Sequence, residues 1–168
     1  MGRARTKIRS GPGRRRFDSL EQEVFLNLWR TYDRLKSLED VVFGQVGLSA
    51  QQYNTLRLLR SVHPGSMPTL VLGARLISRA PDMTRLLDRL EQRGLLCRER
   101  RPDNRRVVEV TITSQGLELL DTIGAAVKQC HRRQLGHLES KSLRQLVQLL
   151  QAARQPHEDA ENLSFVDE

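Results

Sequence analysis

Arginines are concentrated in two short stretches of the chain, where their spacing suits contacts with a nucleic acid. Arg85 and Arg89 stand four residues apart in a segment whose apolar residues recur at helical spacing. Further arginines crowd the segment 98–106, and they are Arg98, Arg100, Arg101, Arg105 and Arg106. An arginine can bond the O6 and N7 atoms of guanine in bidentate fashion, or it can grip a phosphate. Both stretches are therefore candidate DNA-contacting sites.

The first stretch is predicted to form a helix that starts near Pro81 and ends at Gly94. Its buried face is defined by apolar residues at i, i+3, i+4 and i+7, namely Met83, Leu86, Leu87 and Leu90. The opposite face is polar and carries Asp82, Arg85, Asp88, Arg89 and Gln92, with Thr84 at its flank. Exposed arginines on helices often form surface ion pairs, so Arg85 and Arg89 have nearby aspartates as alternative partners.

The second stretch is predicted to be a β-hairpin with a basic tip. Apolar residues alternate with polar ones before Ile112, at the period of a half-buried strand. The segments 95–101 and 107–112 are the expected strands, and Pro102-Asp103-Asn104-Arg105 has the composition of a turn. We expect the hairpin to fold without its arginines. An arginine on a narrow loop suits the minor groove of DNA, where negative potential is concentrated.

The remaining segments are predicted to be helices. From Phe17 to Phe43 an apolar stripe runs without Pro or Gly over roughly 40 Å of helix. One small core cannot cover that length, so we expect part of it to pack against another subunit; the alternative is a helix folded wholly onto its own domain. Ser49 is the expected N-cap of a helix that runs to about Val62. A short helix at 67–76 follows, and two more come after the hairpin, the first capped by Thr113 or Ser114.

Composition limits the classes of protein to which the chain can belong. Its 168 residues suit one ordinary domain, and 28 Lys+Arg against 20 Asp+Glu give a net charge of +8. An apolar run of about 18 residues is missing, as is the apolar core of a signal peptide, so we expect a cytoplasmic protein without a transmembrane helix. The two cysteines, Cys97 and Cys130, are too few for a disulfide framework.

The two ends of the chain carry opposite charges. Residues 1–16 contain seven basic residues and no acidic one, whereas 157–168 contain five acidic residues and no basic one. The first segment has too little apolar surface to fold alone, so it is predicted to be a disordered basic arm that meets phosphates. Alternatively, the arm is a solubilising tail, or it folds loosely against the acidic C-terminus.

A short helix, a tight turn, a basic helix and a basic-tipped hairpin form the layout of a winged helix-turn-helix. The sequence of this region resembles that of the MarR-type transcription regulators. The resemblance rests on two segments, 84–96 (TRLLDRLEQRGLL, followed by Arg98) and 103–116 (DNRRVVEVTITSQG). These are similar to the recognition helix and the wing signature of that family. The motifs cover about the middle half of the chain, and the order of helices extends the likeness over most of 17–155.

The resemblance implies a mainly α fold with a small β-hairpin wing, in which a winged helix-turn-helix lobe sits on a helical dimerisation stalk. It implies a MarR-like domain at 17–155, with the DNA lobe at about 48–113 and dimerisation helices at about 17–44 and 114–155. An acidic tail would follow at 156–168. The implied function is sequence-specific regulation, more often repression, by a homodimer on a pseudo-palindromic double-stranded DNA operator.

The resemblance also implies roles for individual residues. Thr84 and Arg85 would contact bases, Arg89 would make a phosphate or positioning contact, and Arg105 would enter the minor groove. Arg106, beside it in the wing, completes the set of DNA-binding candidates. Asp103 would brace the wing rather than contact DNA.

Some features depart from the family or leave its properties open. The basic arm lies outside the family pattern, and Ala80-Pro81-Asp82 is a less typical start for a recognition helix. The acidic Asp82 is expected either to tune specificity or to weaken affinity.

Many members release DNA on binding a small effector, but here Trp29, Tyr32, His63 and Arg57 are only vague candidates, and we assign no ligand site. Some members sense oxidants through a cysteine near the first helix, which this chain lacks. Cys97 and Cys130 are expected to act as small buried hydrophobes.

The sequence offers no pattern for a metal, a cofactor or a catalytic site. The histidines do not stand at metal-binding spacing, and no nucleophile elbow or phosphate-binding loop is present. The favoured hypothesis is therefore a sequence-specific transcription regulator that is not an enzyme. The rival hypothesis is a nonspecific or architectural DNA-binding protein that uses its basic N-terminal arm.

Overall fold

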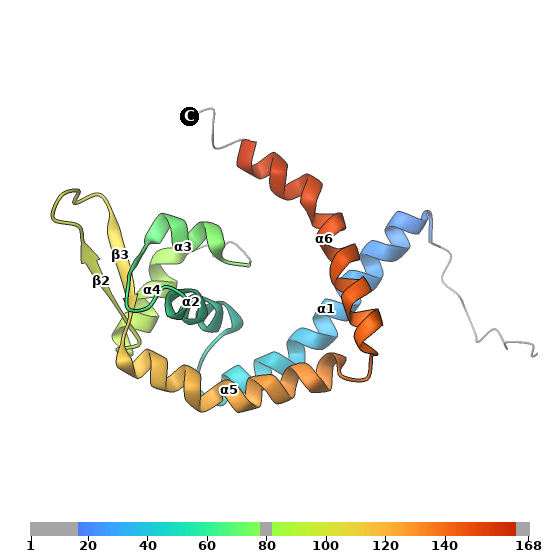
Figure 1. Ribbon diagram of the computed structural model, residues 1–168, viewed down its shortest axis with the longest axis horizontal. Helices are drawn as coiled ribbons and strands as arrows, with labels where there is room; N and C mark the ends of the chain where they lie inside the picture. The colour runs from blue at the N-terminus through green and yellow to red at the C-terminus, as the bar shows by residue number, and fades with distance from the viewer. Residues whose placement is uncertain (1–16, 78–81, 164–168) are drawn as a thin grey trace, which may run out of the picture. The chain divides into compact units, whose positions relative to one another are not determined.

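The computed structural model describes residues 17–77 and 82–163 and contains, within those ranges, six helices and three short strands. The chain divides into two compact units, residues 1–36 and 37–168. This is the mainly α fold with a small β-hairpin wing that the sequence predicts, of the α+β class (Figure 1). The basic arm at 1–16 lies outside the described residues.

The prediction of a long helix at 17–43 is confirmed by helix α1 (Leu20–Gly44). It begins where the Ser19 hydroxyl accepts the backbone N–H of Gln22 at 3.2 Å. Its N-terminal part exposes large apolar side chains, among them Phe25 at 61% and Trp29 at 63%. Its C-terminal part, from Ser37 on, belongs to the second unit, where Phe43 is buried and stacks on the ring of Tyr53.

Helix α2 (Ala50–Arg60) starts at Ser49, as predicted from the N-cap residue. The hydroxyl of Ser49 accepts the Gln52 N–H at 3.2 Å, and the Gln52 side chain accepts the Ser49 N–H at 2.9 Å. This reciprocal pair is a capping box, which satisfies two backbone donors that the first helical turn leaves without partners.

The prediction that a short helix begins at residue 67 is wrong for the first two residues. Met67 and Pro68 form strand β1, and the helix α3 begins only at Thr69 (Thr69–Arg75). Met67 lies opposite Val110 in an antiparallel ladder. The physical reason is that a proline disfavours helical geometry at the residue before it, which leaves Met67 extended.

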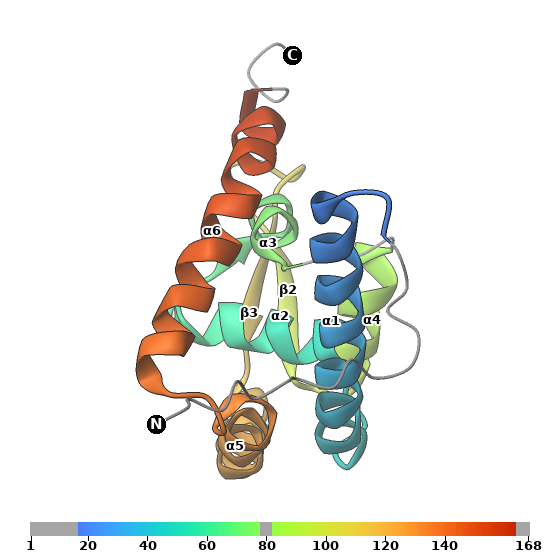
Figure 2. The same cartoon turned by 90° about the vertical axis from the view of Figure 1, so that its right-hand side faces the viewer.

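Helix α4 (Met83–Gln92) and the hairpin of β2 (Leu96–Arg100) and β3 (Val108–Ile112) complete the lobe formed by α2, α3 and the sheet. The three strands are antiparallel in the order β1-β3-β2. Figures 1 and 2 show the hairpin of β2 and β3, and α4 lies against β2. Gly94 ends the helix with a φ of 66°, as predicted for a residue in the left-handed region. The expected start near Pro81 lies outside the described residues.

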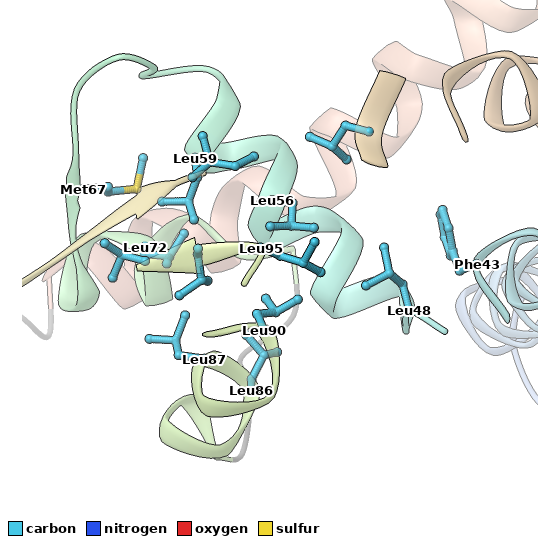
Figure 3. Close-up of a cluster of buried hydrophobic side chains, with 14 of the residues drawn as sticks. Phe43, Leu48, Leu56, Leu59, Met67, Leu72, Leu86, Leu87, Leu90 and Leu95 are labelled. Carbon is cyan, nitrogen blue, oxygen red and sulfur yellow. The ribbon is translucent and has the colours of Figure 1, made fainter. Parts of the chain in front are cut away.

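The core of the lobe is aliphatic, as the low aromatic content requires. It joins α2, α3, α4 and the sheet through side chains that are 2% exposed or less, including Leu56, Leu59, Leu72, Leu87 and Leu90 (Figure 3). Val110 and Ile112 of β3 are also buried in it, which confirms the alternation expected for this strand. Leu86, Leu87 and Leu90 anchor α4 by one face, so the opposite face of that helix is turned to solvent.

Helices α5 (Ser114–Leu135) and α6 (Ser140–Leu163) follow the hairpin. Thr113 is the N-cap of α5, and its hydroxyl accepts the Gly116 N–H at 3.1 Å and donates to the Gly94 carbonyl at 2.6 Å. Helix α6 continues through Pro156, past the boundary at 155 that we expected before the acidic tail. Strong helix formers on both sides of the proline favour this continuation. Residues 164–168 lie outside the described ranges.

Candidate nucleic-acid interface

Helix α4 presents its predicted contact residues to solvent. Thr84, Arg85 and Arg89 are all exposed, whereas Leu86 and Leu87 between them are buried. The side chain of Arg85 is 80% exposed. Among the described residues, none forms an ion pair with Arg89. The apolar spacing therefore predicted the correct face, and this face carries cationic groups that a DNA groove could accept.

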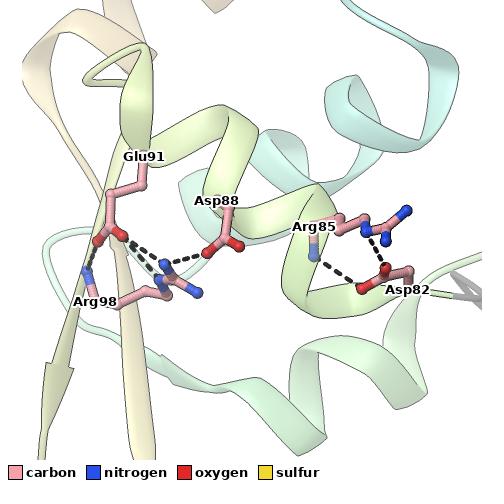
Figure 4. A network of polar contacts seen from close by, with 5 residues as sticks. All are labelled: Asp82, Arg85, Asp88, Glu91 and Arg98. Carbon is pink, nitrogen blue, oxygen red and sulfur yellow. Dashed lines mark hydrogen bonds and ion pairs between the residues drawn. The ribbon is translucent and has the colours of Figure 1, made fainter.

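Asp82 organises the N-terminal end of α4 (Figure 4). It is the N-cap residue, and its Oδ1 atom accepts the backbone N–H of Arg85 at 2.9 Å. Its other oxygen, Oδ2, lies 2.9 Å from Nε of the Arg85 side chain. Of the nearby aspartates that the sequence offers as partners for Arg85, Asp82 is therefore the actual partner. Asp88 binds Arg98 instead.

The wing tip between β2 and β3 carries Arg105 and Arg106, both exposed. Arg101, at the start of the turn, donates from Nε and Nη2 to the two carboxylate oxygens of Asp103 at 3.1 and 3.0 Å. The Asn104 side chain accepts the backbone N–H of Arg106 at 3.1 Å. These local bonds hold the turn in shape, which matches the bracing role expected of Asp103, and they leave the Arg105 and Arg106 side chains outward.

Arg98 does not belong to this exposed group, contrary to our expectation that the hairpin needs none of its arginines. Its Nε and Nη2 atoms donate to Oε2 of Glu91 at 3.0 and 2.6 Å, and Nη2 also donates to Asp88 at 2.5 Å (Figure 4). Its backbone N–H donates to the other Glu91 oxygen at 2.9 Å. Hydrogen bonds from the Arg98 guanidinium lower the pKa of the Glu91 carboxyl. Arg98 therefore ties the wing strand β2 to helix α4.

Arg93 forms a second structural link that sequence reasoning missed. Its two terminal nitrogens donate to the carbonyls of Gly47 at 2.7 Å and Val46 at 2.9 Å. These bonds join the C-terminal end of α4 to the loop between α1 and α2. A basic residue at the end of a helix gives no sequence signal for partners so distant in the chain.

Other candidate chemistry receives little support. Cys97 is exposed, so the buried role expected for it is wrong; Cys130 is buried, and desolvation raises the pKa of its thiol. Trp29 and Tyr32 form an exposed apolar patch on α1, together with Phe25 and Leu28. In the described ranges, no cluster of His, Cys, Asp or Glu is arranged to hold a metal ion. Every helix in those ranges is too short or too polar to cross a bilayer.

Comparisons with known proteins agree with this architecture. Residues 48–108 match the model of the MarR family. The HTH-type transcriptional regulator MhqR of Bacillus subtilis (strain 168) is 31% identical over 101 residues, which span 60% of this chain and 68% of that protein. A second regulator of the same organism, YkoM, is 31% identical over 64% of this chain and 71% of its own length.

A solved structure shows a closer likeness. The crystal structure of a MarR transcription factor from Planctomyces limnophilus is 58% identical to this chain and superimposes with a TM-score of 0.65. The match covers 82% of this chain and 99% of that one. It therefore includes the lobe that carries α4 and the wing as well as flanking helices. The chain belongs to the MarR family of DNA-binding transcription regulators.

Proposed function

We propose that this regulator binds a pseudo-palindromic operator as a homodimer and represses transcription from it. The observation that carries the proposal is the arrangement of exposed cations on α4 and at the wing tip. Helix α4 would enter a major groove, where Thr84 and Arg85 contact bases and Arg89 contacts phosphate. Arg105 and Arg106 would reach the adjacent minor groove, where the potential is most negative.

Dimerisation is supported by apolar surface that the chain leaves exposed. On α1 the exposed side chains include Leu20 at 71% and Tyr32 at 64%, and on α6 they include Val147 at 52% and Leu149 at 61%. Monomeric proteins rarely expose contiguous apolar stripes of this kind. We therefore assign 17–44 and 114–155 to the dimerisation helices and about 48–113 to the DNA lobe. Two lobes related by a twofold axis would read two half-sites about one helical turn apart.

Release of DNA on binding a small effector is part of the same proposal, because many MarR-type regulators respond in this way. The apolar patch on α1 lies on the stripe assigned to dimerisation, so we do not assign it to an effector.

Replacing Arg85 by alanine tests the proposed base contact. On the preferred duplex the affinity is expected to fall by about 1–3 kcal/mol, because a bidentate contact to a base edge is lost. On unrelated duplexes the loss should be much smaller. Electrophoretic mobility shifts at one fixed salt concentration measure both. Equal losses on preferred and unrelated DNA would contradict base reading by Arg85.

Deleting residues 1–16 tests the rival, architectural function. If the arm supplies most of the affinity, deletion should weaken binding to all duplexes equally and abolish retention of DNA near physiological salt. If the lobe supplies specificity, the truncated protein keeps its preference and loses only salt-dependent affinity. The arm contains seven basic residues. Without them, the plot of log binding constant against log salt concentration should become shallower, by up to about 6 units of slope per chain. An unchanged slope would show that the arm does not neutralise phosphates.

A further inference from the structure

The ion pair between Asp82 and Arg85 is an unusual feature for a DNA-contacting surface, because a carboxylate is repelled by phosphates. Asp82 stands at the N-terminal end of the proposed recognition helix, and its side chain is 46% exposed. The proposed function does not explain why an acidic residue occupies this position. The geometry of the pair offers an explanation, which rests on that proposed function.

Helix capping alone does not require a carboxylate. One oxygen, Oδ1, accepts the backbone N–H of Arg85, and a serine hydroxyl could do the same. The second oxygen is engaged only with the Arg85 side chain. Because both side chains are well exposed, the pair adds little to the stability of the free protein. Its effect must therefore be sought in the state where DNA covers it, since water is excluded there and charges interact more strongly.

The pair restricts Arg85 in a way that suits a base edge. The carboxylate is fixed by the capping bond, and it contacts the guanidinium at Nε. Among the described residues, none accepts a hydrogen bond from Nη1 or Nη2 of Arg85. These two terminal nitrogens form the end-on edge of the guanidinium, and guanine presents two acceptors, O6 and N7, at matching separation. When DNA covers the pair and excludes water, the strengthened interaction with Asp82 holds this edge toward the base.

The pair also makes a loose contact with phosphate less favourable. Asp82 neutralises the charge of Arg85, so the guanidinium gains less from the negative DNA backbone in general. A directional contact with two acceptors on one base is affected less. We infer that Asp82 is a positioning residue for specificity, which holds Arg85 to read a guanine at one position of each half-site.

Asp82→Ser separates this role from capping, because serine keeps an N-cap oxygen and removes the second oxygen and its charge. Full-length wild type, Asp82→Ser and Arg85→Ala are compared on the preferred duplex, on duplexes carrying each other base at every half-site position, and on unrelated DNA. In the wild type, guanine should be favoured about tenfold or more at one position. Asp82→Ser should lower that preference at least about threefold while leaving the other positions unchanged, because Arg85 is no longer held. Its affinity for unrelated DNA should be equal or higher, because a negative charge is lost.

A control variant accounts for the change in net charge. Glu99 is exposed on β2 of the same lobe, and no contact with Arg85 involves it. Glu99→Gln should raise affinity for all duplexes without altering base preference. Asp82→Asn, which also caps helices, serves as a second variant if the serine substitution lowers the melting temperature.

The outcomes distinguish this inference from the proposed function. If Arg85→Ala loses the guanine preference but Asp82→Ser and Asp82→Asn both retain it in full, the inference is wrong and the proposed base contact stands. If Arg85→Ala retains every base preference, both are wrong. If Asp82→Ser loses affinity equally for all duplexes, the inference is also overturned, because that result indicates that Asp82 has a purely structural role.

Discussion

Replacement of Gly116 by alanine is expected to destabilise the folded protein by about 3 kcal/mol, near the upper end of what overpacking costs. Gly116 is buried in the first turn of α5, where its backbone approaches the end of the hairpin. A Cβ atom there would overlap the carbonyl oxygen of Leu95 and would lie 2.7 Å from Cγ1 of Ile112. Neither neighbour is a flexible side-chain tip, so the backbone itself would have to move.

The consequence extends to α4 and the sheet because Gly116 is bonded into the junction between the wing and α5. Its N–H donates to the Thr113 hydroxyl, which in turn donates to the carbonyl of Gly94 at the end of α4. The Thr113 N–H donates to the carbonyl of Leu95 at 3.2 Å. A displaced α5 would therefore disturb the end of α4 as well as the sheet.

Urea denaturation of full-length protein measures this effect, and Gly124 provides the matched control. Gly124 lies in the same helix, and a Cβ there would meet no side chain or other segment of the described chain within 4 Å. Gly124→Ala should stabilise the protein by about 0.5–1 kcal/mol, since glycine is unfavourable in a helix interior. Equal effects of the two substitutions would contradict the close approach at Gly116.

Replacement of Arg98 by methionine is expected to destabilise the protein by about 2 kcal/mol, because charge-assisted hydrogen bonds to Glu91 and Asp88 are lost. Methionine preserves much of the apolar stem, so the comparison isolates the guanidinium. The side chain of Arg98 is 24% exposed, and the two carboxylates left behind are exposed enough for water to solvate them. Affinity for the preferred duplex should also fall, because the wing loses its attachment to α4.

The pH dependence gives an independent check on the same contact. Since Arg98 lowers the pKa of Glu91, the unfolded state binds a proton more readily than the folded state does. The stabilisation is fully present above the ordinary value of 4.5 and is lost as the pH falls through the lower folded-state pKa. The difference in unfolding free energy between wild type and Arg98→Met should therefore be constant near neutral pH and shrink in acid. Arg100→Met, an exposed position on the same strand, should change stability little; a comparable loss there would contradict the assignment.

Much of the fold could be predicted because apolar spacing and capping residues act locally. Leu86, Leu87 and Leu90 define the buried face of α4 from their spacing alone, and Gly94 and Ser49 mark helix ends through backbone rules. The strand at Met67 could not be found in this way. Its partner in the ladder is Val110, far away in sequence, and two residues are too few to show a periodic pattern.

The candidate site was predictable in its location and less so in its internal contacts. Arg85 was expected either to contact DNA or to pair with a nearby aspartate, and the structure shows that pairing with Asp82 leaves the guanidinium exposed. Arg98 was assigned to the exposed tip because sequence spacing does not reveal that the turn at Gly94 brings β2 back beside Glu91. The exposure of Cys97 likewise depends on which face of β2 packs, and a short strand with few apolar residues does not specify this.

Selection from a randomised duplex library, with full-length protein near physiological salt, shows whether the protein reads bases as a symmetric dimer. A homodimer that reads bases with α4 should enrich an inverted repeat whose half-sites lie about one helical turn apart. Retention of DNA without any enriched motif, or enrichment of a single half-site without its symmetric partner, would contradict a homodimer that reads bases with α4.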